Sequence, residues 1–383
     1  MAAISNIATK SAGWLVVGAG FTGASAARYL AETTGEKIIV IDRRDHVAGN
    51  AYDELVSGIR LHRYGPHIFH TNSEQVWNFL SRFTRWRPYE HRVRAMIDGR
   101  AVPLPFNLNS IRMCFPAAQA ERLITRLIAE YGARTRVPVL KLVQSPDPEI
   151  SELGRFVHDN VFLNYTTKLW GVPPDELQSS VTARVPIYLG DDDRYFHDKY
   201  QAMPADGFAA LFDSMLDHPD IEVALNTDFH DIAPSDRPRR ILYTGAIDAF
   251  FDWRFGELEY RSLRFEHETL DVPFFQPVGT VNYPAEPELI RITESKHITG
   301  GNAPNTVITR EYPAPYVAGA TDALYPMLRR GPDKAVPLYQ AEAARLQGSV
   351  WFGGRLADYQ YYNMDQACAR GLTLAGRQFA RAL

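Results

Sequence analysis

Residues 15–30 read LVVGAGFTGASAARYL, and the interpretation of the whole chain starts from them. The apolar run at the start gives way to Gly18, Gly20 and Gly23, and then to Ala- and Leu-rich sequence with helical spacing. A strand, a tight glycine turn and a helix in this order suit a pyrophosphate, because backbone amides and the helix N-terminus then face the phosphate oxygens. We therefore predict a dinucleotide-binding domain here, the alternative being a turn that binds nothing.

A second strand and its acidic end support this prediction. Residues 37–41 lead into Asp42, about twenty residues after the last glycine, where a carboxylate can accept hydrogen bonds from a ribose. A strand-end cap is the alternative for Asp42, and a solvated surface residue is the alternative for Arg43, which begins the next loop. The cofactor contacts predicted in this part of the chain are Gly18, Gly20, Phe21, Thr22, Gly23, Asp42, Arg43 and Asn50.

Length and composition narrow the classes of partner. At 383 residues the chain exceeds what one core usually serves, so two or three domains are expected. The net charge of -4 disfavours a nucleic-acid partner, and no apolar run is long enough to span a membrane. Cys114 and Cys368 form neither a disulfide framework nor metal-ligand spacing. We expect a cytoplasmic protein without metal.

Three histidines lie close together at positions 62, 67 and 70. No cysteine or carboxylate cluster accompanies them, and Gly65-Pro66 forces a turn between them, so zinc is disfavoured. The loop is predicted to present His67 to a cofactor ring, with a hydrogen-bonded core histidine as the open alternative.

The rest of the chain divides by pattern into an α/β fold with three domains. Helical spacing dominates residues 116–171, and strand alternation returns in 258–312 after a hairpin at 91–103. Residues 221–225 and 240–245 are predicted to be outer strands of the dinucleotide domain. The predicted domains are a discontinuous Rossmann-like FAD domain (12–88, 203–250, 345–383), a helical domain (105–180) with a mobile loop at about 176–190, and an antiparallel sheet domain (89–104, 185–202, 251–344).

FAD is preferred to NAD because of the C-terminus. A strand ending at Gly353-Gly354 and a late helix from residue 366 suit the pyrimidine end of a flavin, where a helix dipole stabilises negative charge. Basic residues in the alternating strands predict an anion pocket, with an ordinary solvated face as the alternative. Arg184, on the connection between two domains, is well placed to clamp a diphosphate.

With both glycine sites in view, the chain resembles the UDP-galactopyranose mutase family over nearly its full length. The stretches that carry the resemblance are 17–23 (VGAGFTG), 64–72 (YGPHIFHTN), 165–171 (YTTKLWG), 183–186 (ARVP), 243–248 (YTGAID), 258–263 (LEYRSL), 310–313 (REYP) and 352–359 (FGGRLADY). The resemblance implies a discontinuous FAD domain, a helical domain and a six-stranded antiparallel domain.

The resemblance also implies an isomerase in which reduced FAD acts as a nucleophile without net redox change. Flavin N5 would form a covalent adduct with the sugar, so that a nucleoside diphosphate pyranose becomes a furanose, UDP-galactose by default. NADPH or NADH would be the external reductant, and a homodimer is expected.

The same resemblance implies roles for individual residues. Arg184 and Arg291 would contact the diphosphate with help from tyrosines, and His67 would lie beside the flavin. The implied substrate contacts are Tyr165, Trp170, Tyr195, Asn282, Tyr325, Tyr361 and Asn363, and the further flavin contacts are Arg261, Gly354, Arg355 and Met364.

Three departures from the family pattern leave the substrate open. Asn363 stands where Asp is usual, Leu169 where Gln is usual, and Ala48 where Gly is usual. A GDP-linked sugar such as GDP-arabinopyranose or GDP-fucopyranose is therefore an alternative. An FAD-dependent amine-oxidase-like oxidoreductase is a second alternative, but it would leave the arginines and tyrosines without a use.

Overall fold

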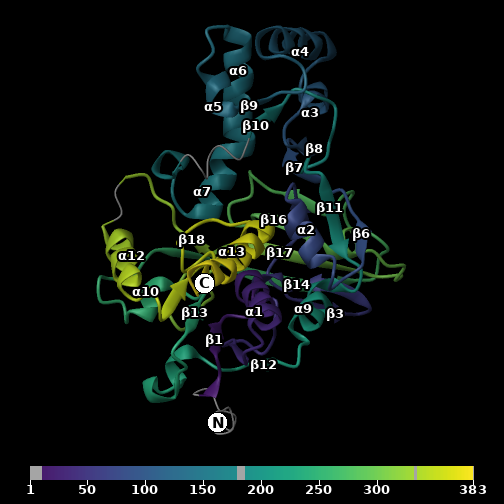
Figure 1. Ribbon diagram of the computed structural model, residues 1–383. Coiled ribbons are helices and arrows are strands. Elements are labelled where there is room, and N and C mark those ends of the chain that lie inside the picture. Colours follow the sequence, from purple (N-terminus) through teal and green to yellow (C-terminus); the bar gives the residue numbers. More distant parts are fainter. Residues whose placement is uncertain (1–10, 179–185, 332–333, 383) are drawn as a thin grey trace.

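The computed structural model describes residues 11–178, 186–331 and 334–382, with side chains up to residue 376. Arg184 therefore lies outside the described residues. Figure 1 shows helices α3 to α6 standing as an arm above the two main sheets. Within the described residues, no helix combines the length and apolar character needed to cross a membrane.

A parallel five-stranded sheet forms the base of the molecule, in the order β12-β2-β1-β13-β19. Its strands are apolar and mostly buried, as expected for a sheet covered on both faces. The strand next to β1 is β13, so residues 240–245 supply an inner strand rather than the outer one predicted. The bounds are β1 Trp14–Val17, β2 Ile38–Ile41, β12 Ile221–Ala224, β13 Ile241–Tyr243 and β19 Val350–Phe352.

Three helices cover one face of this sheet and join distant parts of the chain. They are α1 (Phe21–Thr34), α9 (Gly207–Leu216) and α13 (Met364–Ala382), and Figure 1 shows the first and last side by side. The α1–α13 contact is made at backbone distance, because a Cβ at Gly371 would lie 2.3 Å from the carbonyl oxygen of Thr22. Cys368, which is a free thiol, accepts a hydrogen bond from Ser25 in the same contact.

The second main sheet has seven strands in the order β18-β14-β17-β16-β15-β7-β8. It is mostly antiparallel, but β15 pairs with β7 in parallel. The expected sheet had six strands; β18 was not recognised because two residues are too short to alternate. The bounds are β7 Val93–Ile97, β8 Arg100–Leu104, β14 Tyr260–Leu270, β15 Thr280–Asn282, β16 Arg291–Glu294, β17 Thr306–Pro315 and β18 Tyr325–Pro326.

The helical arm has its own apolar core, to which strands β7 and β8 also contribute. Its helices are α3 Leu108–Cys114, α4 Ala117–Tyr131, α5 Val139–Val143, α6 Pro148–Val157 and α7 Asn164–Trp170, with a π-helical turn at His158–Leu163 between the last two. Strand β10 (Pro186–Tyr188) pairs with β9 (Arg136–Pro138) within the arm.

Smaller elements connect these parts. Two small sheets contain β3 (Asp53–Val56) with β4 (Ile59–His62), and β5 (Phe69–Thr71) with β11 (Tyr200–Pro204) and β6 (Trp86–Pro88). The remaining helices are α2 Glu74–Leu80, α10 Ile247–Phe250, α11 Ser295–Thr299 and α12 Ala335–Arg345, and short 3-10 turns lie at 49–51, 174–176, 229–231 and 234–236.

The close α1–α13 contact gives a prediction for Gly371→Ala. The new methyl group cannot fit against α1, so we expect a loss of about 1–3 kcal/mol in the free energy of unfolding, measured in urea. Gly376→Ala, in the same helix, is the control: its Cβ would find no atom closer than 3.7 Å, so the variant should gain up to about 1 kcal/mol from helix propensity. Equal effects of the two substitutions would contradict this account.

Candidate dinucleotide and nucleotide-sugar site

A cavity of about 380 Å³ opens where strands β1, β2, β13 and β19 end. The carboxyl ends of parallel strands are the usual place for a nucleotide in this type of sheet. Residues from both ends of the chain line it. The predicted cofactor contacts among its lining residues are Gly18, Gly20, Phe21, Thr22, Asp42, Arg43, Asn50, His67, Gly354, Arg355 and Met364, and Asn363 lies beside them.

The glycine turn suits a pyrophosphate. Helix α1 begins after Gly20 with no side chain capping its first amides, so these donors are left for a ligand in the cavity. Gly23 does not line the cavity; it lets the helix press on the turn, since a Cβ there would lie 1.9 Å from the carbonyl oxygen of Gly18. A dinucleotide fits this arrangement.

Asp42 ties the glycine turn to the end of β2. One carboxylate oxygen accepts a hydrogen bond from the amide of Ala19 at 2.9 Å, and the other accepts one from the amide of Arg44 at 3.0 Å. Arg43 forms an ion pair with Asp322 at 2.6 Å, so this predicted cofactor contact also joins the dinucleotide domain to the loop before β18.

Arg261 lies elsewhere. Its guanidinium donates to the carbonyl oxygens of Leu169 and Lys168, at 3.2 and 3.3 Å, and so caps the C-terminal end of α7. It does not line the dinucleotide cavity. Lys168 in turn donates to three carbonyl oxygens between β15 and β16, with burial lowering its pKa to about 8. These two residues seat α7 on the sheet.

An aromatic cluster stands next to the cavity. The rings of Tyr325 and Tyr361 are stacked with centroids 5.4 Å apart, and Trp170 approaches them at 6.1 and 5.7 Å respectively. The guanidinium of Arg355, which lines the cavity, lies 5.4 Å from both tyrosine ring centroids. Residues from α7, β18 and the C-terminal loop, far apart in sequence, therefore meet here.

Arg291 and Glu311 form a buried ion pair on the neighbouring sheet, with a distance of 2.8 Å. Glu311 is fully buried, whereas a fifth of the Arg291 side chain stays accessible. Burial would lower the pKa of Arg291, but the charge of Glu311 outweighs it and raises that pKa. Asn282 lies opposite Arg291 in register, and within the described part of the chain neither Asn282 Oδ1 nor Arg291 Nε has a hydrogen-bond partner.

Electrostatic contacts connect this pair with the remaining predicted residues. Burial raises the pKa of the Tyr165 phenol, and the nearby charge of Arg291 opposes this rise. Tyr195 is also close enough to affect the pKa of Tyr165. His67 lines the cavity, and the positive charges of Arg291 and Arg355 contribute to lowering its pKa. Tyr165 and His67 are therefore close to Arg291, and Tyr195 is close to Tyr165.

Histidines around the site are held neutral. Burial lowers the pKa values of His62, His67 and His91 to about 3. The backbone amide of His67 donates to His62 Nδ1 at 3.1 Å, and His67 Nδ1 donates to the carbonyl oxygen of Gly65 at 3.0 Å. His70 lies apart and pairs with Asp198. Over the described ranges, no group of three or more His, Cys, Asp or Glu could hold a metal ion.

Comparison with known proteins agrees with this geometry. A family model for UDP-galactopyranose mutase matches residues 160–361, and one for an NAD(P)-binding Rossmann-like domain matches residues 16–83. A probable UDP-galactopyranose mutase of Klebsiella pneumoniae is 33% identical over 94% of this chain and 93% of its own length. The chain belongs to the UDP-galactopyranose mutase family. It is therefore an enzyme of the isomerase class.

The relatives of this chain in the UDP-galactopyranose mutase family are named for different sugars, and solved structures with the same fold are named for different reactions. A dTDP-fucopyranose mutase of Escherichia coli is 34% identical over 92% of this chain and 94% of its own length. A crystal structure of reduced UDP-galactopyranose mutase matches 96% of this chain and 94% of its own with a TM-score of 0.74 at 15% identity, which shows the shared fold. A putrescine oxidase variant shares that fold too, with a TM-score of 0.60 at 14% identity over 97% of this chain and 99% of its own, so the fold alone does not identify the reaction.

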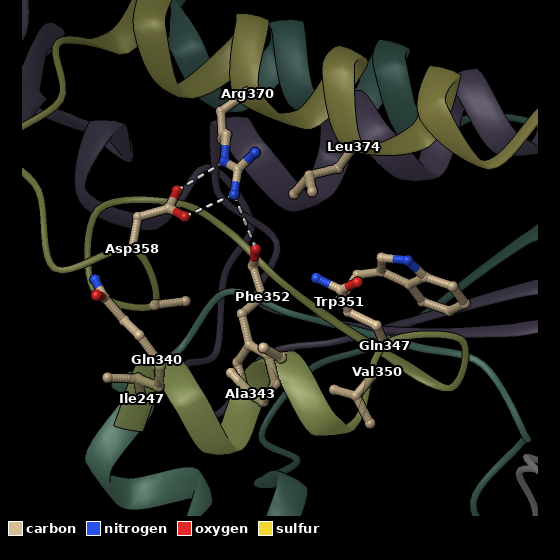
Figure 2. Close-up of a pocket in the computed structure, with 12 residues that line it drawn as sticks. Ile247, Gln340, Ala343, Gln347, Val350, Trp351, Phe352, Asp358, Arg370 and Leu374 are labelled. Atoms are coloured by element: carbon tan, nitrogen blue, oxygen red, sulfur yellow. Dashed lines mark hydrogen bonds and ion pairs between the residues drawn. The ribbon is translucent and has the colours of Figure 1, made fainter. Parts of the chain in front are cut away.

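Two features of this mutase-family site were missed at the sequence level. Glu311 had a signal, since it is the charged residue among the buried positions of its strand, where a charge needs a partner. Asp358 accepts hydrogen bonds from the amide of Gly354 and from both Nε and Nη2 of Arg370. Figure 2 shows this pair beside a second cavity, of about 280 Å³, which is bordered by α12, β19 and α13. No local pattern predicts this pair.

The neutral histidines give a pH prediction. Because the pKa values of His62, His67 and His91 are about 3 when folded and near 6.5 when unfolded, the unfolded chain binds more protons between those values. The free energy of unfolding should therefore fall as pH drops below about 6.5, by up to about 1.4 kcal/mol per pH unit for each histidine.

His91→Gln isolates one of these contributions. Its free energy of unfolding, measured between pH 4.5 and 7, should depend less steeply on pH by about one proton. His230→Gln removes an exposed histidine and serves as the control. An unchanged slope in His91→Gln would show that this imidazole binds its proton equally well in the folded and the unfolded protein.

Proposed function

We propose that this protein is a flavin-dependent mutase that interconverts the pyranose and furanose forms of a nucleoside diphosphate sugar, with UDP-galactopyranose as the first candidate. The observation that carries the proposal is the buried Arg291–Glu311 pair, which lies near the aromatic cluster. Among the described residues, Arg291 Nε has no hydrogen-bond partner, and neither has Asn282 Oδ1 on the neighbouring strand. A fixed guanidinium of this kind suits a departing diphosphate.

FAD is the proposed cofactor. The glycine turn and Asp42 would hold the ADP half, and His67, Gly354, Arg355 and Met364 would surround the flavin ring. When reduced and bound there, FAD would supply a nucleophilic nitrogen for the anomeric carbon, with no net redox change. The N-terminus of α13 would stabilise negative charge on the pyrimidine ring. NADPH or NADH as reductant, a homodimer and a cytoplasmic location belong to the same proposal.

The chain's own groups would hold the substrate on the flavin and exclude water. Arg291 would bind the diphosphate with the phenols of Tyr325 and Tyr361, while Glu311 keeps the guanidinium in place. Asn282 would accept a hydrogen bond through its free carbonyl oxygen. Arg184 outside the described residues, with Tyr165, Trp170 and Tyr195, would complete the enclosure.

A dTDP-6-deoxyhexose is the second candidate substrate. The relative named dTDP-fucopyranose mutase supports it, at an identity similar to that of the relative named for UDP-galactopyranose. Asn363 removes a negative charge next to the diphosphate site, and Leu169 packs among apolar residues near Trp170. GDP-linked pyranoses remain in the set to be tested.

A substrate panel tests the proposal. The purified protein should be yellow and should bleach with dithionite. The reduced form should convert one of UDP-galactopyranose, dTDP-fucopyranose or a GDP-pyranose to its furanose, and chromatography measures this conversion. No oxidant should be consumed. Peroxide production with an amine, and no furanose from any of these sugars, would favour the oxidase alternative.

Arg291→Ala tests the diphosphate contact. We expect turnover to fall by at least about a hundredfold, while FAD remains bound, because a donor to the developing charge is lost. Arg310→Ala, on the adjacent strand, is the matched control, since Arg310 pairs with exposed Glu268 and should leave turnover nearly unchanged. Near-normal turnover in Arg291→Ala would remove this residue from the site, and loss of FAD would point to misfolding.

A further inference from the structure

Trp253 is held in an unusual conformation at the mouth of the dinucleotide cavity. Its side chain lines the cavity and is 39% exposed. Both Asp252 and Trp253 have a φ of 52°, in the left-handed region. Asp tolerates that region, whereas a large aromatic residue there is an outlier. Glycine is the residue that usually occupies such positions after a helix.

The surrounding turn enforces this conformation. The amide of Trp253 donates to the carbonyl oxygen of Asp248 at 2.9 Å, as in a helix C-terminal motif, and the carboxylate of Asp248 holds the returning chain through the amide of Leu258 and the phenol of Tyr260. Arg254 packs over the Phe251 ring at 4.8 Å. The residues on either side are anchored, and Trp253 between them lines the cavity.

No other group accounts for the position of the indole. In the part of the chain that the structure describes, Trp253 has no hydrogen bond through its side chain and no ring partner, although the neighbouring Phe250 and Phe251 have several. A strained backbone at a cavity that exposes an unpaired aromatic ring is a reason to look for a ligand.

Contacts place this turn at the Asp42 end of the cavity. The amide of Thr227 donates to the carbonyl oxygen of Asp42, and the chain then continues to Phe229. The ring of Phe229 stacks on Phe250 at 5.4 Å, shortly before Trp253. Asp42 marks the ribose of the adenosine half, whereas Gly354 and Met364 mark the other half. A flat apolar ring at this end suits a purine base.

We propose that Trp253 is an adenine-binding residue, whose indole stacks on the purine base of the dinucleotide and covers the outer end of the cavity. This inference rests on the proposed FAD site and adds the residue that recognises its base. Stacking by an indole contributes affinity without demanding a particular hydrogen-bond pattern, and the enforced turn keeps the ring in place before the ligand arrives.

Binding of FAD, ADP and FMN to the FAD-stripped protein tests the inference, with calorimetry as the readout. Trp253→Ala should weaken the binding of FAD and of ADP by roughly tenfold or more, because the stacking of the base on the indole is lost. FMN has no adenine, so its affinity should stay the same. Trp253→Phe should restore most of the affinity for ADP.

Asp252→Gly is the matched control, since glycine also adopts the left-handed conformation of this position and the indole is left intact, so the variant should keep wild-type affinity for ADP. If Trp253→Ala does not fold, the quenching of wild-type tryptophan fluorescence by ADP, compared with Trp253→Phe, decides the matter. Affinities in Trp253→Ala within twofold of wild type, or quenching that is the same in Trp253→Phe, would overturn the inference. A wild-type protein that binds no FAD would instead overturn the proposed function.

Discussion

The approach of α1 and α13 at backbone distance is the constraint on which the rest of the site depends. Gly371 permits it, because any side chain there would overlap the carbonyl oxygen of Thr22. The consequence is that the C-terminal loop reaches the glycine turn, although more than three hundred residues separate them. The contact anchors α13, whose first residue, Met364, lines the dinucleotide cavity with Gly354 and Arg355.

A second constraint is electrostatic. The ion pair of Arg291 and Glu311 is expensive to bury, and apolar residues of the same size would often be at least as stable. Within the described residues a donor of Arg291 and an acceptor of Asn282 are left without partners, so the presence of this ion pair is better explained by a ligand than by stability. Such a pre-oriented guanidinium does not have to reorganise when charge develops on a leaving diphosphate.

The same fold serves different reactions in different proteins. A putrescine oxidase variant shares it at a TM-score of 0.60, so the dinucleotide domain and the large sheet do not by themselves specify the chemistry. The proposed reaction of the present chain rests instead on Tyr325, Tyr361 and Arg355, which meet between α7, β18 and the C-terminal loop. Asn363 and Leu169 lie in or beside this set, which is why the identity of the sugar is separable from the type of reaction.

The sequence by itself determined the dinucleotide domain, the helical arm and the family, and most of the cofactor contacts that it predicted line the cavity. Local patterns suffice for these, because a glycine turn, a helical period and an Asp at a strand end each depend on residues that are close together in the sequence. Only the tertiary structure decided that Arg261 caps α7, that Glu311 pairs with Arg291, and that Trp253 lines the cavity. The strand order and the parallel β15–β7 pair were likewise decided there. Each of these contacts depends on which distant segments pack together, and the spacing of residues along the chain does not predict that packing.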